Sequence, residues 1–125
     1  MENDYSLSDY QGKYLLVEFS SSWCGWCKKE IPFLQKVFEE HKNNQEFAMI
    51  TISMDDIKEI WVEHVKKEKL PWPVISDLKA FKGETAQAFN VQGIPMIFLI
   101  DKKGKILMKG LRGEDMVNKL REILK

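Results

Sequence analysis

The sequence predicts an α/β fold in which helices flank a mixed β-sheet. Apolar runs that suit buried strands alternate with amphipathic stretches of helical spacing along the first part of the chain. Two further apolar runs, separated by the turn "KKG", predict a β-hairpin, and an amphipathic stretch ends the chain. Alternating strands and helices are typical of parallel pairing, whereas a hairpin is antiparallel. We therefore expect both kinds of pairing in one sheet.

Two buried strands and an intervening helix are expected in the N-terminal part. Residues 13–21, "KYLLVEFSS", are apolar enough for a buried strand, and residues 46–54, "EFAMITISM", are rich in β-branched side chains. Between them, the stretch from residue 25 to about residue 42 has helical periodicity. Its apolar positions are Ile31, Leu34, Val37 and Phe38.

A second helix and a short strand are expected next. Residues 55–70 predict a helix with Asp55 or Asp56 as its N-cap. Four apolar residues share one face of this helix: Ile57, Ile60, Trp61 and Val65. "PWPVISD" ends the helix and offers a short strand near residues 74–75, and "GETAQAFN" suits a short helix that ends near Asn90.

The C-terminal part is expected to form the hairpin and a last helix. "PMIFLID" and "KILMKG" are the two strands, and "GEDMVNKLREILK" is an amphipathic helix. The inward residues of this helix are Met116, Val117, Leu120, Ile123 and Leu124. No internal repeat or low-complexity linker interrupts the chain, so we expect residues 1–125 to form a single domain.

The composition is ordinary for a soluble globular protein, with 44% hydrophobic and 30% charged residues. Lys and Arg together number 19, as do Asp and Glu, so charge gives no reason to expect nucleic-acid binding. No apolar run approaches the roughly 20 residues of a membrane helix, so the chain is not expected to span a membrane. The first residues, "MENDYSLSDYQG", are too polar for a signal peptide and fit either a cytoplasmic start or a trimmed chain.

Cys24 and Cys27 are the only cysteines, and they lie in "SSSWCGWCKKEIP". A structural zinc site needs four ligands, usually two such pairs or one pair with two histidines. His41 and His64 lie on different predicted helices without ligand-like spacing, so no metal site is expected. Simple core packing is a poor account, because a strand leads straight into Cys24 and a helix leaves it.

A redox pair suits this position better. Cys24 lies at the start of the predicted helix, where free N–H groups and the helix dipole stabilise a thiolate. Cys27 lies one turn later and deeper, within reach of Cys24 for a disulfide. We therefore expect Cys24 to be the attacking thiol and Cys27 the resolving thiol. No dissociable cofactor is implied, because the dithiol itself carries two electrons.

"WCGWCKKEIP" after "LLVEF", with "VQGIP" much later, resembles the thioredoxin superfamily. The lead-in "LSDYQGKYLLVEF" and the pattern "CKKEIP" are most similar to the TlpA/ResA-like thiol–disulfide oxidoreductases of bacterial envelopes. The stretch between Ser53 and Pro95 has room for an extra helix and strand around residues 61–76. The resemblance implies a thioredoxin-like sandwich with this insertion before a cis-proline loop.

The resemblance also implies a substrate-binding surface. In the family, the residue that matches Pro95 is cis and packs against the disulfide, and Ile94 before it offers backbone groups to the substrate strand. Trp23, Gly25 and Trp26 surround the cysteines and complete the expected surface. Trp26 replaces the proline that is common there, and we expect an exposed aromatic ring that faces substrate.

Two acids are candidates for the proton acceptor of Cys27, since a buried thiol must lose its proton before it can attack. Glu30 lies three residues after Cys27 on the same helix face and matches the acid of the envelope family. Glu18 lies six residues before Cys24 and matches the buried acid of ordinary thioredoxins. An unpaired carboxylate inside the apolar run "LLVEF" is costly as mere packing. The two acids remain alternatives.

The sequence thus predicts a thiol–disulfide oxidoreductase that acts on protein disulfides, as a reductant rather than an oxidant. The expected partners are a protein thiol or disulfide substrate and an upstream redox partner, and the chain is expected to be a monomer. The resemblance places it in the periplasm or cell envelope, with the cytoplasm as the alternative. The alternative function is a thioredoxin-fold binding module or metallochaperone whose two thiols hold a metal.

Overall fold

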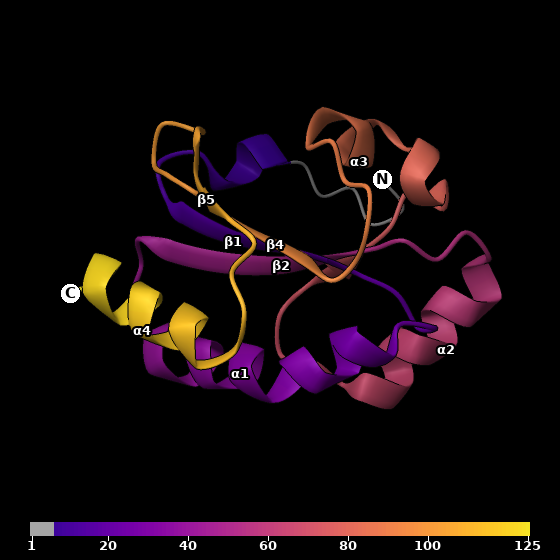
Figure 1. Cartoon of the computed structure of the whole chain (residues 1–125), viewed down its shortest axis with the longest axis horizontal. Coiled ribbons are helices and arrows are strands. Elements are labelled where there is room, and N and C mark those ends of the chain that lie inside the picture. The colour runs from indigo at the N-terminus through magenta and orange to yellow at the C-terminus, as the bar shows by residue number, and fades with distance from the viewer. Residues whose placement is uncertain (1–6) are drawn as a thin grey trace.

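The computed structural model describes residues 7–125, which form a five-stranded sheet flanked by helices (Figure 1). The strands are β1 (Tyr14–Ser20), β2 (Phe47–Ser53), β3 (Val74–Ile75), β4 (Met96–Ile100) and β5 (Ile106–Lys109). Their order in the sheet is β3-β2-β1-β4-β5. β2 pairs in parallel with β1 and β3, whereas β4 runs antiparallel to β1 and β5. The predicted mixed sheet is confirmed.

Helices cover both faces of this sheet. The helices are η1 (Leu7–Tyr10), α1 (Gly25–His41), α2 (Lys58–Glu68), η2 (Ala80–Lys82), α3 (Glu84–Ala88) and α4 (Gly113–Ile123). In Figure 1, α1, α2 and α4 lie on one face and α3 on the other. α2 and β3 form the helix–strand segment expected before the Pro95 loop. Among the described residues, no helix combines the length and apolar character needed to cross a membrane.

Alternation along β1 decides which side chains reach which helical layer. Leu16 belongs to a buried cluster with Leu34 of α1 and Met116 of α4. The neighbouring Leu15 and Val17 belong to a second cluster on the opposite face. Side chains two residues apart on a strand share a face. Glu18 therefore lies on the same face as Leu16, beneath α1.

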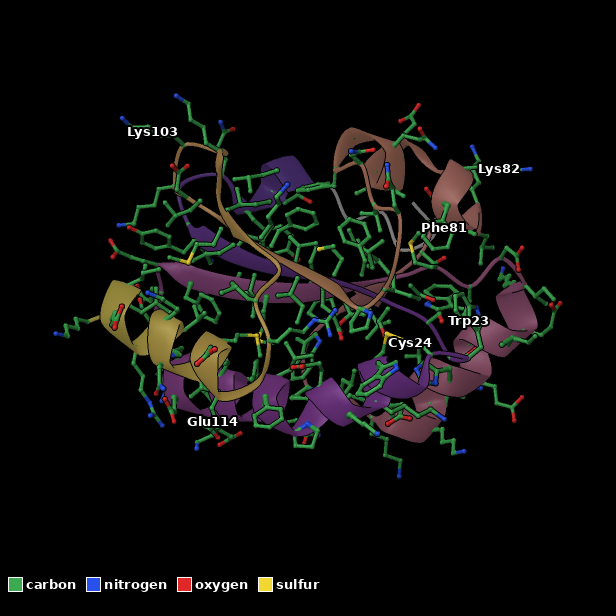
Figure 2. The ribbon with its side chains drawn as sticks, in the orientation of Figure 1. Trp23, Cys24, Phe81, Lys82, Lys103 and Glu114 are labelled. Atoms are coloured by element: carbon green, nitrogen blue, oxygen red, sulfur yellow. A yellow bond between two sulfur atoms is a disulfide. The ribbon has the colours of Figure 1, made fainter. Side chains whose placement is uncertain are left out.

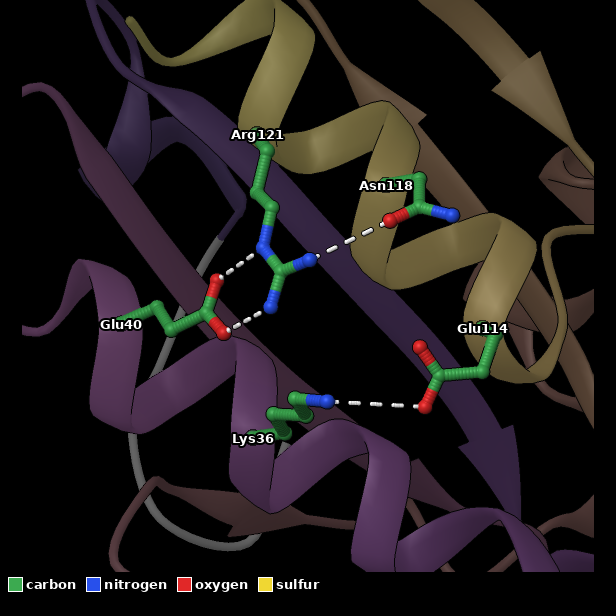
Figure 3. A network of polar contacts seen from close by, with 5 residues as sticks. All are labelled: Lys36, Glu40, Glu114, Asn118 and Arg121. Carbon is green, nitrogen blue, oxygen red and sulfur yellow. Dashed lines mark hydrogen bonds and ion pairs between the residues drawn. The ribbon is translucent and has the colours of Figure 1, made fainter.

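Polar contacts between α1 and α4 lie along the outside of the first cluster (Figure 3). Arg121 donates from Nε and Nη2 to the Glu40 carboxylate at 2.8 and 2.6 Å, and from Nη1 to Asn118 at 3.3 Å. Lys36 pairs with Glu114, in the first turn of α4, at 3.6 Å. Exposed pairs contribute only about 0–1 kcal/mol each. The apolar cluster therefore provides most of the packing energy, and the polar contacts orient α4 along α1.

The predicted N-cap of α2 is wrong, and the apolar face of this helix is only partly buried. Ile57, not Asp55 or Asp56, occupies the N-cap position, and its side chain makes no capping hydrogen bond within residues 7–125. Ile57 and Ile60 are 50% and 44% exposed, whereas Trp61 is buried. Only part of the apolar stripe of α2 packs against the sheet, so helical spacing alone overestimates its buried face.

Candidate active site

The two segments that the sequence singles out for function lie at the same end of the sheet. β1 ends at Ser20 and leads into the turn of Cys24. β4 runs antiparallel to β1 and begins at Met96, directly after Pro95, and Met96 pairs with Phe19 in the sheet. The segment that leaves β1 and the segment that enters β4 therefore emerge together.

Cys24 and Cys27 form a disulfide, with their Cα atoms 5.2 Å apart. Cys24 is the N-cap residue of α1, and its Sγ accepts a hydrogen bond from the Cys27 N–H at 3.1 Å. A sulfur in this position accepts a hydrogen bond from one of the free N–H groups of the first helical turn. The same hydrogen bond stabilises a thiolate after reduction. Cys24 is 6% exposed and Cys27 only 1%. The more exposed of the two cysteines is thus also the one whose sulfur the helix start stabilises.

The turn before Cys24 is fastened to β2 through Asp55. The Ser22 N–H and Oγ donate to the buried Asp55 carboxylate, at 3.1 Å to Oδ2 and 2.7 Å to Oδ1. Ser53 Oγ donates to Asp55 Oδ2 at 2.7 Å. Hydrogen bonds to a charged group are among the stronger ones in proteins. Asp55 therefore fixes the residues that lead into the disulfide, whereas the sequence predicted it as a possible N-cap of the next helix.

Two tryptophans extend into solvent beside the disulfide. Trp23 and Trp26 are 63% and 67% exposed, and Figure 2 shows Trp23 next to Cys24 at the end of the molecule that carries α2. Lys29 Nζ lies 4.4 Å from the centre of the Trp26 ring. Gly25 is exposed, and a Cβ there would meet no atom within 4 Å among the described residues. The surface around Cys24 is therefore open and aromatic.

The loop that enters β4 carries a cis Ile94–Pro95 peptide bond. Pro95 is buried, and Ile94 is half-buried against the second apolar cluster. The Pro95 carbonyl accepts a hydrogen bond from Nη2 of Arg112 at 2.7 Å. Arg112 is the residue before α4, so this loop is tied to the start of the last helix.

Glu18 is buried in β1, with 3% of its surface exposed. Its Oε1 accepts a hydrogen bond from Thr51 Oγ1 at 2.8 Å, and Thr51 Oγ1 in turn accepts one from Trp72 Nε1 at 2.9 Å. Burial raises the pKa of Glu18 from its ordinary value of 4.5 to about 7, the Thr51 hydrogen bond opposes this rise, and the charge of Glu30 adds to it. Glu18 therefore titrates close to neutral pH.

A small cavity lies beside Glu18. Its volume is about 20 Å³, and its lining includes Glu18, Ser21 and Thr51. Glu18 Oε2 and Ser21 Oγ are buried and have no hydrogen-bond partner within residues 7–125. A water molecule needs roughly 10–15 Å³ of such space and two or more polar partners. The cavity thus has the size to hold one water, and two of its lining residues carry a buried oxygen without a partner among the described residues.

Glu30 is also buried, at 8% exposure, and is not the solvated acid that neighbouring Lys28 and Lys29 would suggest. Its Oε2 accepts a hydrogen bond from the N–H of Gly113, the first residue of α4, at 3.1 Å. The carboxylate thereby satisfies one of the free N–H groups at that helix start. Since the charge of Glu30 also raises the pKa of Glu18, the fold brings the two candidate acids within electrostatic reach.

Three contributors to this site escaped the sequence interpretation. Thr51 is found only through the strand register, which sets it opposite Glu18. Arg112 reaches Pro95 across the fold, and no local pattern predicts that contact. Asp55 follows β2 where β1 also ends, and polar residues at the carboxyl ends of neighbouring parallel strands often meet, so this signal was available. Among residues 7–125, no group of three or more His, Cys, Asp or Glu could hold a metal ion.

The sheet order, the disulfide at the start of α1 and the Pro95 loop define a thioredoxin-fold chain with a CxxC disulfide. Residues 1–109 match the model of the AhpC/TSA family, and the chain belongs to that family. The resemblance read from the sequence, to the TlpA/ResA-like members of the thioredoxin superfamily, is confirmed.

Curated and solved relatives agree with this assignment. The chain is 31% identical over 119 residues to thiol-disulfide oxidoreductase ResA of Bacillus thuringiensis, covering 95% of this chain and 66% of that protein. The thioredoxin domain of a thiol-disulfide oxidoreductase from Bacteroides vulgatus is 33% identical, with a TM-score of 0.88 over 97% of this chain and 86% of that one. A thiol-disulfide oxidoreductase from Bacteroides fragilis is 34% identical, with a TM-score of 0.87 over 95% and 87%. The chain spans 58 to 66% of the length of the first curated relatives that it matches.

Proposed function

We propose that this chain is a thiol–disulfide oxidoreductase that reduces protein disulfides through Cys24 and Cys27. The observation that carries the proposal is the disulfide itself, which joins an N-cap sulfur to a more deeply buried one. The names of the relatives, thiol-disulfide oxidoreductase in each case, support the same chemistry.

In the proposed reaction, the Cys24 thiolate attacks one sulfur of a substrate disulfide. A mixed disulfide forms, and the other substrate sulfur leaves as a thiolate that takes up a proton. Cys27 then loses its proton and attacks Cys24 Sγ, which releases the second substrate sulfur and forms the Cys24–Cys27 disulfide. Two electrons pass from the dithiol to the substrate, and an upstream dithiol partner must return them.

The proton of Cys27 passes to one of the two buried acids in this account. Glu18 supports such a role through its pKa of about 7, because a general base is most useful near the working pH. Glu18 also lines a cavity large enough for one water, and its Oε2 has no hydrogen-bond partner among the described residues, so this oxygen is free to accept a proton. Glu30 is the second candidate, and it lies one helical turn from Cys27.

The exposed surface around Cys24 is the proposed docking site for the substrate. Trp23, Gly25 and Trp26 present an open aromatic face, and the backbone of Ile94, before Pro95, is the proposed edge for an extended substrate segment. Location in the periplasm or elsewhere in the cell envelope, and action as a monomer, belong to the same proposal. The resemblance of "CKKEIP" to the oxidoreductases of bacterial envelopes supports the location.

Trapping with the Cys27→Ser variant tests this function. Without the resolving thiol, mixed disulfides through Cys24 will accumulate when the reduced variant meets a protein disulfide. Non-reducing gels and peptide mapping identify the attached cysteine, and Cys24→Ser is the matched control. Adducts that form mainly on Cys27 in the control would reverse the assignment of the two thiols.

A further inference from the structure

Two adjacent residues at the start of α4 contact both halves of the candidate site. Arg112 Nη2 donates to the carbonyl of Pro95 at 2.7 Å, and the N–H of Gly113 donates to Glu30 Oε2 at 3.1 Å. Pro95 belongs to the loop before β4, and Glu30 belongs to the second turn of α1, beyond Cys27. A single dipeptide thus links the loop to the helix that carries the disulfide.

The contact of Arg112 goes to the one backbone polar group that Pro95 has. Proline has no N–H, so the carbonyl is the only backbone group of Pro95 that can form a conventional hydrogen bond. A guanidinium donor makes a charge-assisted bond, which is stronger than a bond between neutral groups. Arg112 occupies the N-cap position of α4, yet its side chain makes no capping bond within the described structure. The guanidinium is therefore directed to the loop rather than to its own helix.

Gly113 adopts a conformation that suits the second contact. Its φ is +54°, a left-handed value that glycine adopts far more easily than other residues. A Cβ at this position would meet no atom within 4 Å among the described residues. The requirement for glycine is therefore conformational rather than steric. This backbone conformation accompanies an N–H directed at Glu30 while the preceding side chain reaches Pro95.

We propose that Arg112 is a positioning residue that holds the Pro95 loop in the orientation in which it accepts a protein substrate. This inference rests on the proposed function, since it assigns the loop to substrate docking. An extended substrate segment can form backbone hydrogen bonds with the Pro95 loop only if the backbone groups of the loop point toward it. A small disulfide needs only access to Cys24. Arg112 should therefore matter for protein disulfides and not for small ones.

The test compares Arg112→Gln with Arg121→Gln in the reduced chain of residues 1–125. Arg121 lies within α4 and binds Glu40 at the surface, so it controls for the loss of one arginine from this part of the chain. We expect Arg112→Gln to raise KM for a protein disulfide about tenfold, equivalent to about 1.4 kcal/mol, with kcat little changed. Its rate with a small aromatic disulfide should stay within about twofold of wild type. Arg112→Lys should recover part of the loss, because it keeps the charge without the planar fork.

A spectroscopic readout separates positioning from general damage. The amide nitrogen of Met96 is bonded to the Pro95 carbonyl carbon, so its ¹⁵N resonance will shift in Arg112→Gln and not in Arg121→Gln. Equal KM values for the two Gln variants, or a loss of rate with both kinds of disulfide in Arg112→Gln alone, would overturn the inference. A wild-type chain that reduces neither disulfide would instead contradict the proposed function.

Discussion

Replacement of Glu18 by Gln tests the buried acid most sharply, because the change removes a titrating group and keeps its shape. The Gln side chain can still accept the hydrogen bond from Thr51 through its carbonyl oxygen. It carries no charge at any pH, so the variant isolates the ionisation of this carboxyl. We expect the stability of the wild-type protein to depend on pH in a way that the variant lacks.

The expected change in the free energy of unfolding follows from the raised pKa of Glu18. In the unfolded chain Glu18 ionises near 4.5, whereas in the folded protein it holds its proton until about pH 7. The folded state therefore binds more protons between these values, and the free energy of unfolding falls as pH rises through this window. The fall amounts to about 3 kcal/mol, at about 1.36 kcal/mol for each pH unit. Below this window Glu18 is protonated in both the folded and the unfolded state, so it does not lower the free energy of unfolding there.

The assay is guanidinium denaturation of the oxidised protein from about pH 4 to about pH 8, with the disulfide kept intact so that the thiols do not titrate. The free energy of unfolding of Glu18→Gln, minus that of wild type, should increase by about 3 kcal/mol across this range. Glu59→Gln, at an exposed position of α2, controls for loss of a carboxylate. Parallel curves for wild type and Glu18→Gln would refute the reasoning from burial.

Two further predictions concern the surface around the disulfide. The fluorescence of Trp23 and Trp26 should change when Cys24 and Cys27 are oxidised, since Trp23 precedes Cys24 and Trp26 lies between the cysteines. Single Trp→Phe replacements assign the change to one ring. Identical spectra in the two redox states would contradict the prediction. Pro95→Ala should slow exchange with a protein disulfide by more than its loss of unfolding free energy explains, because Pro95 is buried in the loop beside β4, and wild-type turnover would exclude a role for this loop.

Much of the fold could be predicted because its signals are local. The apolar run of residues 13–21 became β1 (Tyr14–Ser20), and the helix expected from residue 25 became α1 (Gly25–His41). A strand that leads into a cysteine and a helix that leaves it can be recognised from neighbouring residues alone. For the same reason the N-cap position of Cys24 and the burial of Glu18 could be anticipated.

The remaining features depend on contacts between distant segments. Thr51 reaches Glu18 only through the register of β1 with β2. Arg112 reaches Pro95 only after α4 has packed along α1. Ile60 and Trp61 share the apolar face of α2, yet tertiary packing buries Trp61 and leaves Ile60 exposed. Periodicity shows which residues can face a core, and tertiary packing decides which of them do.

Thiol counting across a series of glutathione redox buffers, combined with metal analysis of the same samples, tests the central claim most directly. The account predicts that Cys24 and Cys27 lose their alkylation together in one reversible two-electron transition, with no metal bound. Cys24→Ser and Cys27→Ser should each abolish that transition. The contradicting result is about one equivalent of metal bound through the thiols, with no Cys24–Cys27 disulfide in any of the redox buffers. That result would favour a metal-binding module.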